Sequence, residues 1–488
     1  MNFYLGLDMG TTAVKAAVFD GSGTMAGVGL TEYALETPAP GIVELDPEVY
    51  WNAAKSAIGK AMRNAGVPAG KIRSVGITGQ AETLIMIDAD GRPLRKAVVW
   101  LDNRAGEEAK ELESRFGRET LFRMSGQTEM LPCWPAAKIL WYRKHQPQLF
   151  AGTAKYLMVE DFICFRLTGK FSACTGLMAS SLYFDIRQRK YDRKMLEVLS
   201  VSEDQLPPLR EPGEFAGTAE ELLPGCPVTI CPIDHVCGNL GSGCTGEGMI
   251  SETTGCTLAV CAAFPQLVYD TGRRFGTYLG SAPGSSVLLP WAPTAGMLLK
   301  HFRDEFAGGM DFRALDAAAA KVPPGSGGLI LLPHCAGAVS PDCNPHARGV
   351  AWGITLAHGR KHFARAIMES VAYLLRDNIE ALRTMGCPVR EIRSLGGASK
   401  SLLWLQIKAD VLNLPVSVTA CEEATALGAA IFGAVACGDC SVAAAVKNMV
   451  KVAFRVEPGG NAGSYQKAFE KYRQLNQILL PTFGEKND

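Results

Sequence analysis

The sequence has no excess of either charge, because 49 Lys and Arg residues balance 49 Asp and Glu residues. Nucleic-acid-binding proteins usually present a basic surface, and so do proteins attracted to anionic membranes. The longest apolar run, 424–437, is rich in Ala and Gly and shorter than the roughly 20 residues that cross a bilayer. We therefore expect no nucleic-acid partner and no membrane partner, and we expect this run to form a packed helix.

Targeting and metal-binding signals are also scarce. The segment MNFYLGLDMG lacks a basic start and carries Asp8 early, so no secretory leader is predicted. Fifteen cysteines without a leader favour free thiols in a reducing cytoplasm. None has the paired spacing of a zinc site. Cys437 and Cys440 form a lone CxxC pair, for which we favour a structural role.

The length of the chain predicts two domains, because 488 residues exceed what one ordinary core holds. The composition, 47% hydrophobic and 20% charged, is globular. We place the boundary near Gly246, which gives domains 1–246 and 247–488. Each half begins with an apolar strand pair around a turn that carries Thr and Gly, at 3–19 and 251–262, so the halves are expected to share a plan.

Hydrophobic spacing predicts helices at 47–65, 107–115, 135–145, 362–383 and from 461 onward. Short apolar runs predict strands at 75–78, 83–88 and 228–231. In 396–416, GGASKSLLWLQIKADVLNLPV, a Gly-Gly turn is expected to lead straight into an amphipathic helix, followed by a strand interrupted by Pro.

The turn after the first strand suits an anion. Gly10, Thr11 and Thr12 offer backbone N–H groups and hydroxyls, and Lys15 follows within reach of the same charge. Asp8 at the strand end is a candidate for Mg²⁺, which prefers carboxylate, water and phosphate oxygens. The alternative is an ordinary hairpin with Gly for positive φ. The segment is not a Walker A loop, so it does not indicate P-loop chemistry.

Two segments of the second half resemble nucleotide contacts. Thr253–Thr257, with Thr254 and Gly255 at its centre, is a candidate second phosphate turn. Gly396–Ser399 would provide a flat backbone shelf for the base, with free N–H groups where a helix starts. Taken alone, the first is as well explained by a plain hairpin and the second by a helix start.

Asp234 is the candidate catalytic base. Phosphoryl transfer to an alcohol needs a group that orients the hydroxyl and accepts its proton. Asp234 precedes a Gly-rich run that we expect to be a loop between the domains. The commoner use of such an Asp is as a helix cap or a turn residue. His235 either hydrogen-bonds the substrate or is an ordinary loop histidine.

Polar residues between the predicted strands suit a polyhydroxy ligand. Gln80 and Glu82 lie between two strands, and a carboxylate accepts hydrogen bonds from vicinal hydroxyls. Trp100 is expected to pack on the apolar face of a sugar, unless it is a core residue. Asp102 and Arg104 follow Trp100 and belong to the same group of polar residues. The alternative for these two is a surface salt bridge.

These blocks together resemble the FGGY carbohydrate kinases, which move the γ-phosphate of ATP to a sugar or polyol hydroxyl. Lys138-Ile-Leu-Trp141 is similar to the core of the family's first signature, and Gly396–Val416 resembles the second. Pro345–Gly349 and Glu423–Ala430 are also similar to the family. The similarity covers nearly the whole chain.

The resemblance implies an actin-like, ribonuclease-H-like α/β fold. It has two domains, each on a mixed sheet, with ATP and sugar in the cleft between them. It also implies Asp234 as base and Asp8 near Mg²⁺, and it allows a homodimer. The implied phosphate-binding positions are Gly10, Thr11, Thr12 and Thr254, and the implied nucleotide-binding positions are Gly296, Gly397, Lys300 and Ser401.

The substrate signals are divided. Ile77–Thr83 and Thr254–Cys256 look like glycerol kinase, but Ala81 stands where that subfamily has Arg. The tyrosine expected before Lys138 is also absent. Loss of a long cation favours a larger polyol or a ketopentose. The segment at 396–416 looks more like xylulose kinase, which usually has Met-His at 81–82.

We therefore expect an Mg²⁺- and ATP-dependent cytoplasmic kinase for a ketopentose such as xylulose. One alternative is a kinase for glycerol or a four-carbon polyol. Another is a non-catalytic actin-like sensor of sugar or nucleotide. A degenerate sensor is expected to lose Asp8 or Asp234, and both are present.

Overall fold

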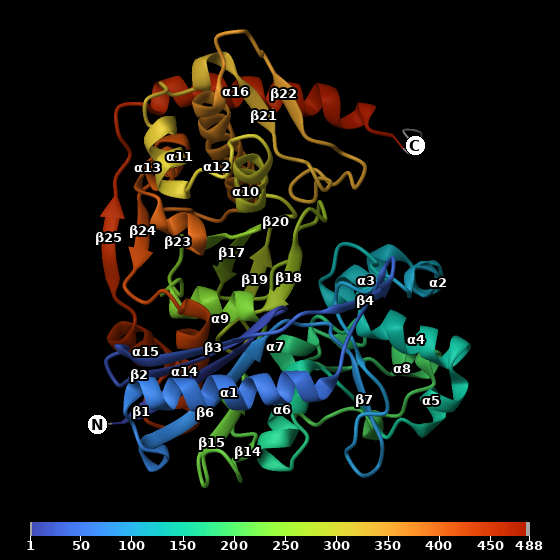
Figure 1. Cartoon of the computed structure of the whole chain (residues 1–488). Helices are drawn as coiled ribbons and strands as arrows, with labels where there is room; N and C mark the ends of the chain where they lie inside the picture. The colour runs from blue at the N-terminus through green and yellow to red at the C-terminus, as the bar shows by residue number, and fades with distance from the viewer. Residues whose placement is uncertain (1, 485–488) are drawn as a thin grey trace.

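The computed structural model describes residues 2–484, which form two lobes, each built on a mixed sheet (Figure 1). The first sheet has the order β14-β15-β6-β1-β2-β3 and the second β18-β19-β17-β16-β23-β24-β25. The strands of the first sheet are β1 (Phe3–Met9), β2 (Ala13–Asp20), β3 (Met25–Glu32), β6 (Ile72–Gly79), β14 (Gly217–Thr218) and β15 (Pro227–Ile230). Those of the second are β16 (Met249–Thr254), β17 (Leu258–Phe264), β18 (Gly276–Leu279), β19 (Ser286–Leu289), β20 (Trp291–Ala292), which pairs with β17, β23 (Glu391–Leu395), β24 (Val416–Thr419) and β25 (Val452–Val456).

The two sheets share one plan. In the first, β1, β2 and β3 pair antiparallel, while β6 and β15 continue parallel on the other side of β1. In the second, β16, β17 and β19 pair antiparallel, and β23 and β24 continue parallel beside β16. The symmetry that the two Thr-Gly turns predicted is therefore present in the strand order and in the strand directions.

Helices cover both sheets. The helices of the first lobe are α1 (Pro47–Ala65), α2 (Gly106–Phe116), α3 (Arg118–Ser125), α4 (Pro135–His145), α5 (Pro147–Gly152), α6 (Val159–Thr168), α7 (Thr175–Met178), α8 (Arg193–Leu199) and α9 (Asp234–Gly241). Short strands lie among them: β4 (Glu36–Ala39), β5 (Ile42–Leu45), β7 (Ile85–Ile87), β8 (Ala97–Val98) and β9 (Lys155–Leu157). The predicted strands 75–78 and 83–88 correspond to β6 and β7.

α1 shows why several boundaries were predictable. The Asp46 side chain accepts the Glu48 N–H at 2.9 Å, Pro47 stands at the first helical position, and Gly66 ends the helix in the left-handed conformation. These are the standard start and stop signals of a helix. The buried face of α1 packs on β2 and β3.

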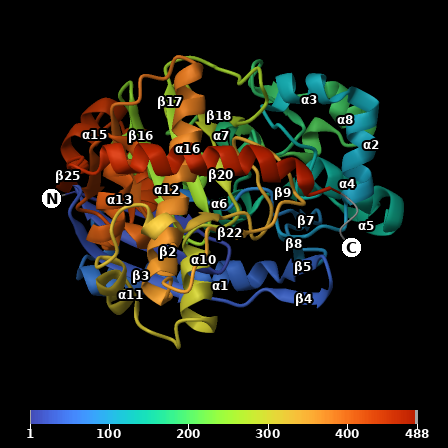
Figure 2. The ribbon, with the colours of Figure 1, turned by 90° about the horizontal axis from the view of Figure 1, so that it is seen from above.

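The second lobe has its own core around the long helix α12 (Arg360–Thr384). The other helices there are α10 (Gly296–Glu305), α11 (Phe312–Ala319), α13 (Leu402–Leu412) and α16 (Ala462–Leu479). Figure 2 shows α16 crossing over α12, and the two helices are in contact. The hairpin of β21 (Ile330–Leu332) and β22 (Val350–Trp352) lies against this core.

A late segment of the chain also contributes to the first lobe. α14 (Ala424–Ala436) and α15 (Val442–Met449) come from the second half, yet α14 packs on β1, β6 and α9 in the lower lobe of Figure 1. Small residues allow this approach: a Cβ built on Gly76 would lie 2.0 Å from the carbonyl oxygen of Ala429. The first lobe therefore includes a late segment of the chain.

Two further expectations need qualification. The segment at 396–416 does not run straight from the Gly-Gly turn into an amphipathic helix, because a short 3₁₀ turn over 397–400 precedes α13, and most of α13 is buried. The helix expected from 461 onward ends at Leu479, and residues 485–488 lie outside the described residues. All fifteen cysteines carry free thiols. Within residues 2–484, none of the helices combines the length and the apolar character needed to cross a membrane.

Candidate active site

Three segments of the first lobe meet where parallel strands end. β1 and β6 are parallel, with Asp8 in register with Thr78, and β15 lies parallel on the far side of β6. Asp8 therefore stands at the same edge as Gln80, which follows β6, and Asp234, which follows β15. Open α/β sheets bind ligands outside the carboxyl ends of their strands. The fold thus gathers the predicted metal, sugar and catalytic residues at one edge.

Asp234 is the first residue of α9, and the expected Gly-rich loop is a helix. The carbonyl of Pro232 accepts the Thr78 hydroxyl at 2.7 Å, which ties this helix start to β6. Ile233 occupies the cap position, so Asp234 is not the helix cap. Its carboxylate accepts the His235 backbone N–H at 2.6 Å, and 34% of the side chain is exposed. A partly exposed carboxylate at this point can receive a ligand hydroxyl.

Side chains from three other segments hold the first turn. The Gly10 carbonyl accepts hydrogen bonds from the Tyr33 hydroxyl and, at 3.3 Å, from the Gln80 amide. The Thr11 hydroxyl accepts the Trp100 indole N–H at 2.9 Å. The Thr12 side chain remains exposed. Side chains of the first lobe therefore hold the turn in place, as a preformed anion site requires.

Gln80 and Trp100 have structural partners that the sequence did not reveal. Gln80 is buried, and its amide oxygen accepts the Thr83 hydroxyl at 3.1 Å. Both ends of its amide thus have partners inside the lobe, and its binding to a sugar stays a prediction. The indole N–H of Trp100 is engaged with Thr11, which leaves the ring faces for a sugar.

Glu82 combines backbone strain with a perturbed pKa. Its φ is 64°, in the left-handed region that residues other than Gly rarely adopt. Burial raises the pKa of its carboxyl to about 7, and Asp234 adds to the rise while Ser180 and Lys138 oppose it. Strain and shifted pKa values concentrate at functional sites. These two properties favour Glu82 as a ligand-binding residue.

Asp8 lies in a cluster of negative charge. Its pKa is raised to about 7, chiefly by burial and also by Asp234 and Glu423, while Lys15 opposes the rise. Lys15 Nζ lies 2.8 Å from Glu423 Oε2, so the cation expected at the phosphate is shared with the second half of the chain. Excess negative charge suits a divalent cation.

The donor set at Asp8 fits Mg²⁺ rather than a metal held in a protein cage. Among residues 2–484, no group of three or more His, Cys, Asp or Glu side chains could hold a metal ion. Mg²⁺ is usually bound through one or two carboxylates together with water and substrate phosphates. Asp8 is the carboxylate that would hold it here.

The second lobe brings its predicted nucleotide contacts together. The Gly255 carbonyl accepts the Gly296 N–H at 2.8 Å, which joins the second turn to the start of α10. The backbone of Gly396 lies against Thr254, where an added Cβ would be 2.9 Å from the carbonyl oxygen. A Cβ on Gly255 or Gly397 would meet nothing within 4 Å. Open space next to this bare backbone is what a flat base and its phosphates need.

A buried network supports the second turn. The Thr254 hydroxyl donates to Glu252 at 2.7 Å and accepts a hydrogen bond from Lys408 Nζ at 3.0 Å. Lys408 also pairs with Glu252 at 2.5 Å, and both side chains are fully buried. Thr254 is thus positioned by an ion pair beneath the turn.

Three residues that were predicted to bind nucleotide or substrate lie near other protein groups in the structure. Lys300 is exposed and pairs with Asp304 one turn along α10, at 2.9 Å. The Ser401 hydroxyl caps α13 by accepting the Trp404 N–H at 3.1 Å. The His235 ring lies 3.9 Å from Asp234.

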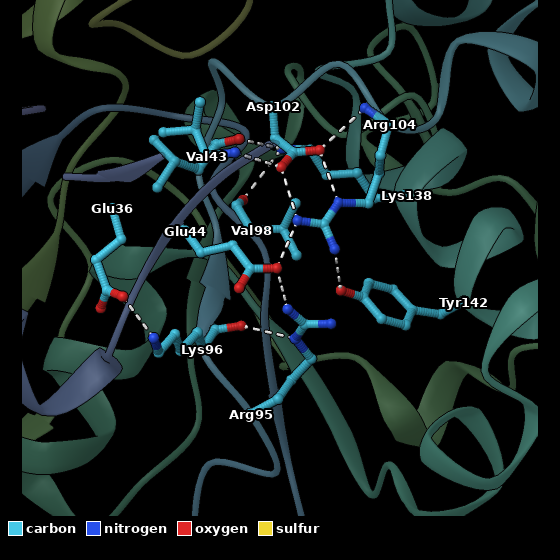
Figure 3. Close-up of polar contacts among 11 residues, drawn as sticks. Glu36, Val43, Glu44, Arg95, Lys96, Val98, Asp102, Arg104, Lys138 and Tyr142 are labelled. Atoms are coloured by element: carbon cyan, nitrogen blue, oxygen red, sulfur yellow. Dashed lines mark hydrogen bonds and ion pairs between the residues drawn. The ribbon is translucent and has the colours of Figure 1, made fainter. Parts of the chain in front are cut away.

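Asp102 and Arg104 form a buried network, and the alternative of a surface salt bridge is wrong. Asp102 accepts the Val43 N–H at 2.7 Å and two hydrogen bonds from Arg104 at 2.8 Å. Arg104 also reaches Glu44 at 2.5 Å (Figure 3). The network therefore anchors the segment that follows Trp100.

Comparison with known proteins identifies the family. Residues 3–241 match the N-terminal domain of the FGGY family of carbohydrate kinases, and residues 245–437 match its C-terminal domain. The chain belongs to the FGGY family of carbohydrate kinases. This FGGY kinase is accordingly an ATP-dependent enzyme that acts on a sugar or polyol.

Relatives of two kinds are about equally similar to this FGGY kinase. The xylulose kinase of Bacillus subtilis strain 168 is 27% identical over 97% of each chain. The glycerol kinase of Thermococcus gammatolerans is 29% identical, also over 97% of each chain. The structure of a ligand-bound xylulose kinase from Lactobacillus acidophilus matches with a TM-score of 0.91 at 23% identity, over 99% of this chain and 100% of that one. This likeness confirms the two-domain actin-like fold.

Sequence reasoning missed several supporting residues of this FGGY kinase. Lys408 and Glu423 were not singled out, although each is a charge within or beside a largely apolar segment. Glu160 was also missed; both of its carboxylate oxygens are buried without a hydrogen-bond partner. Burial raises its pKa well above the ordinary range. The available signal was a pair of acidic residues, Glu160 and Asp161, at the start of a largely apolar helix.

Proposed function

We propose that this kinase transfers the γ-phosphate of ATP to a primary hydroxyl of a ketopentose such as xylulose, with Asp234 as the base. The carrying observation is the partly exposed Asp234 carboxylate at the start of α9, at the strand edge shared with Asp8 and the segment of Glu82. Asp234 would orient the hydroxyl and accept its proton as the phosphorus–oxygen bond forms. Glu82 would accept hydrogen bonds from the other hydroxyls of the sugar.

The two Thr-Gly turns would hold the phosphates from opposite lobes. Thr12 is exposed on the first turn, and Gly255 faces open space on the second. Asp8 would hold Mg²⁺, which would neutralise charge on the phosphate oxygens. Gly397 would provide the surface for the base. Fixed N–H groups and hydroxyls stabilise the charge of transfer without having to reorganise.

The acceptor preference rests on what surrounds Glu82. Ala81 is buried and carries no donor, and Cys133 lies near both Glu82 and Lys138. A pocket without a long cation has room for more carbons than glycerol has. Glycerol or a four-carbon polyol is the second candidate, because Glu82-Thr83 matches the glycerol kinase pattern and the glycerol kinase relative is equally similar. A cytoplasmic location and a homodimer complete the proposal.

The direct test is ADP release from Mg-ATP with a panel of acceptors. The panel contains glycerol, erythritol, ribitol, xylitol, xylulose, ribulose, gluconate and fuculose. We expect one strong response, from a ketopentose. Turnover of glycerol alone would replace the proposal with the second candidate, and nucleotide binding without turnover on any member would point to an untested sugar.

Asp234→Asn tests the assignment of the base. The variant keeps the size and most of the hydrogen bonding of the side chain but cannot accept the proton. We expect transfer to be abolished while ATP still binds, as measured by ADP release and nucleotide titration. Near-wild-type turnover would disprove the assignment.

Glu82→Ala tests the acceptor site. We expect the acceptor KM to rise far more than the ATP KM, because Glu82 belongs neither to the two phosphate turns nor to the Gly397 surface proposed for the base. Equal losses for both ligands would mean that Glu82 is structural.

A further inference from the structure

A fully buried lysine lies behind the predicted acceptor residues. Lys138, on α4, has no exposed surface. Its Nζ donates to three backbone carbonyls, those of Glu82 at 2.8 Å, Val98 at 3.2 Å and Val99 at 3.1 Å. No carboxylate within the described residues forms an ion pair with it. A buried charge satisfied only by carbonyls is unusual, because burial disfavours the charged form.

The three carbonyls belong to the two segments that carry the acceptor residues. One is the carbonyl of Glu82 itself, whose backbone is in the left-handed region. The others directly precede Trp100, and Figure 3 shows Lys138 directed toward Val98. One ammonium group therefore joins the Glu82 turn to the Trp100 segment.

We propose that Lys138 is a positioning residue for the sugar or polyol, holding the Glu82 turn and the Trp100 segment at a fixed separation across its three N–H donors. The inference rests on the proposed role of Glu82 in acceptor binding. Lys138 itself touches neither the acceptor nor the reacting atoms. Without the ammonium group, the Glu82 carbonyl loses its donor, and the backbone can relax toward ordinary φ values and move the carboxylate.

The chemistry of the donor matters at this position. An ammonium group directs three N–H bonds from one atom, which matches three converging carbonyls. Methionine has nearly the same volume and no donor. A buried carbonyl that loses its only donor is costly, so the strained turn is expected to rearrange.

The second lobe offers a matched comparison. Lys408 is also fully buried, but its partners are Glu252 and Thr254 beneath the second phosphate turn. The same substitution, Lys to Met, therefore removes a buried ammonium group on the nucleotide side. Lys144→Met, on the same helix as Lys138 but partly exposed, controls for the change in side chain alone.

The experiment measures KM for the acceptor and for ATP in wild type, Lys138→Met, Lys408→Met and Lys144→Met. We expect Lys138→Met to raise the acceptor KM by about tenfold or more, with the ATP KM within about twofold of wild type. Lys408→Met should show the opposite selectivity, and Lys144→Met should change neither value. An unchanged acceptor KM in Lys138→Met, or equal rises in both KM values, overturns the inference. If the wild type phosphorylates no acceptor, the proposed function fails instead.

Two measurements cover the case in which Lys138→Met does not fold. Lys138→Gln keeps an N–H donor but not the ammonium group, and it should likewise raise the acceptor KM while leaving the ATP KM nearly unchanged. In the wild type, burial lowers the pKa of Lys138 to about 8, so the acceptor KM should rise selectively above that pH as the third N–H is lost. Glu82, whose pKa is raised to about 7, ionises as the pH rises and then accepts hydrogen bonds from the sugar more strongly, so its titration would lower the acceptor KM. The pKa of Cys133 is raised far above this range, that of Asp102 is lowered and that of Arg104 is raised. A flat acceptor KM above pH 8 overturns the inference.

Discussion

The contact between α9 and α14 makes a sharp prediction about one glycine. A Cβ built on Gly241 would lie 1.8 Å from the Ala424 carbonyl oxygen and 2.8 Å from the Gly428 nitrogen. Both obstacles are backbone atoms, so no side chain can turn aside. A carbon and an oxygen in contact need about 3.3 Å, so Gly241→Ala must push the helices apart by roughly 1.5 Å. Overpacking of this kind typically costs 1–3 kcal/mol, and we expect about 3 kcal/mol or more.

Gly238, one turn earlier in α9, is the matched control. A Cβ there would lie 3.3 Å from the Thr425 hydroxyl oxygen, which is the end of a side chain and can adjust. Ala in place of Gly inside a helix is worth roughly 0.5–1 kcal/mol, so Gly238→Ala should be about as stable as wild type or slightly more stable.

The assay is urea unfolding of the ligand-free protein, compared at the first transition because two lobes need not unfold together. Gly241→Ala should also lower turnover, because Asp234 begins the displaced helix. Equal stability of the two variants would refute the reasoning, since it would mean that α9 and α14 separate without cost.

Two more predictions concern the acceptor and phosphate sides. Burial raises the pKa of Glu82 to about 7. Between about pH 4 and 7 the folded protein therefore keeps a proton on Glu82 that the unfolded chain has lost. Because the folded state binds more protons in this range, the free energy of unfolding falls as the pH rises. Glu82→Gln should therefore be more stable than wild type above pH 7 and equal to it near pH 4 in thermal denaturation; a constant offset would contradict the assignment. Trp100→Phe keeps an aromatic ring, though a smaller one, and loses the N–H bonded to Thr11, so the ATP KM should rise by between about twofold and tenfold. The double variant Thr11→Val/Trp100→Phe should then have the same ATP KM as Thr11→Val alone. If the two substitutions instead raise the ATP KM additively, the lost hydrogen bond is not the cause.

Local signals predicted the helices well where the chain itself carries start and stop residues. α1 and α4 were predicted to their terminal residues, because Pro stands at the first position of each and Gly66 ends α1. The doubled strand plan was visible in the two Thr-Gly turns. In each case, the determining residues are neighbours in sequence.

Errors arose where distant segments decide the structure. The glycines after Asp234 indicated a loop, but they serve the close approach of α14, which is almost two hundred residues away in the chain. Asp102 and Arg104 looked like surface residues because their further partners, Val43 for Asp102 and Glu44 for Arg104, lie on another strand. Nothing in the local sequence indicated that the Gln80 amide hydrogen-bonds the Gly10 carbonyl. A single sequence does not record which of several uses a Gly or a polar side chain has.

The return of α14 to the first sheet has a consequence for how the protein is made. A buried hydrophobic cluster joins Tyr4 and Phe19 from the start of the chain to Leu427 and Phe432 near its end. During synthesis the first sheet is complete once residue 230 has emerged, but its cover is not available until residue 436 has left the ribosome. The nascent first lobe must therefore wait with apolar strands uncovered while nearly half of the chain is still being translated. A fragment that stops at residue 246 would keep that exposed face permanently, and we expect it to aggregate or to bind chaperones rather than fold as an independent domain.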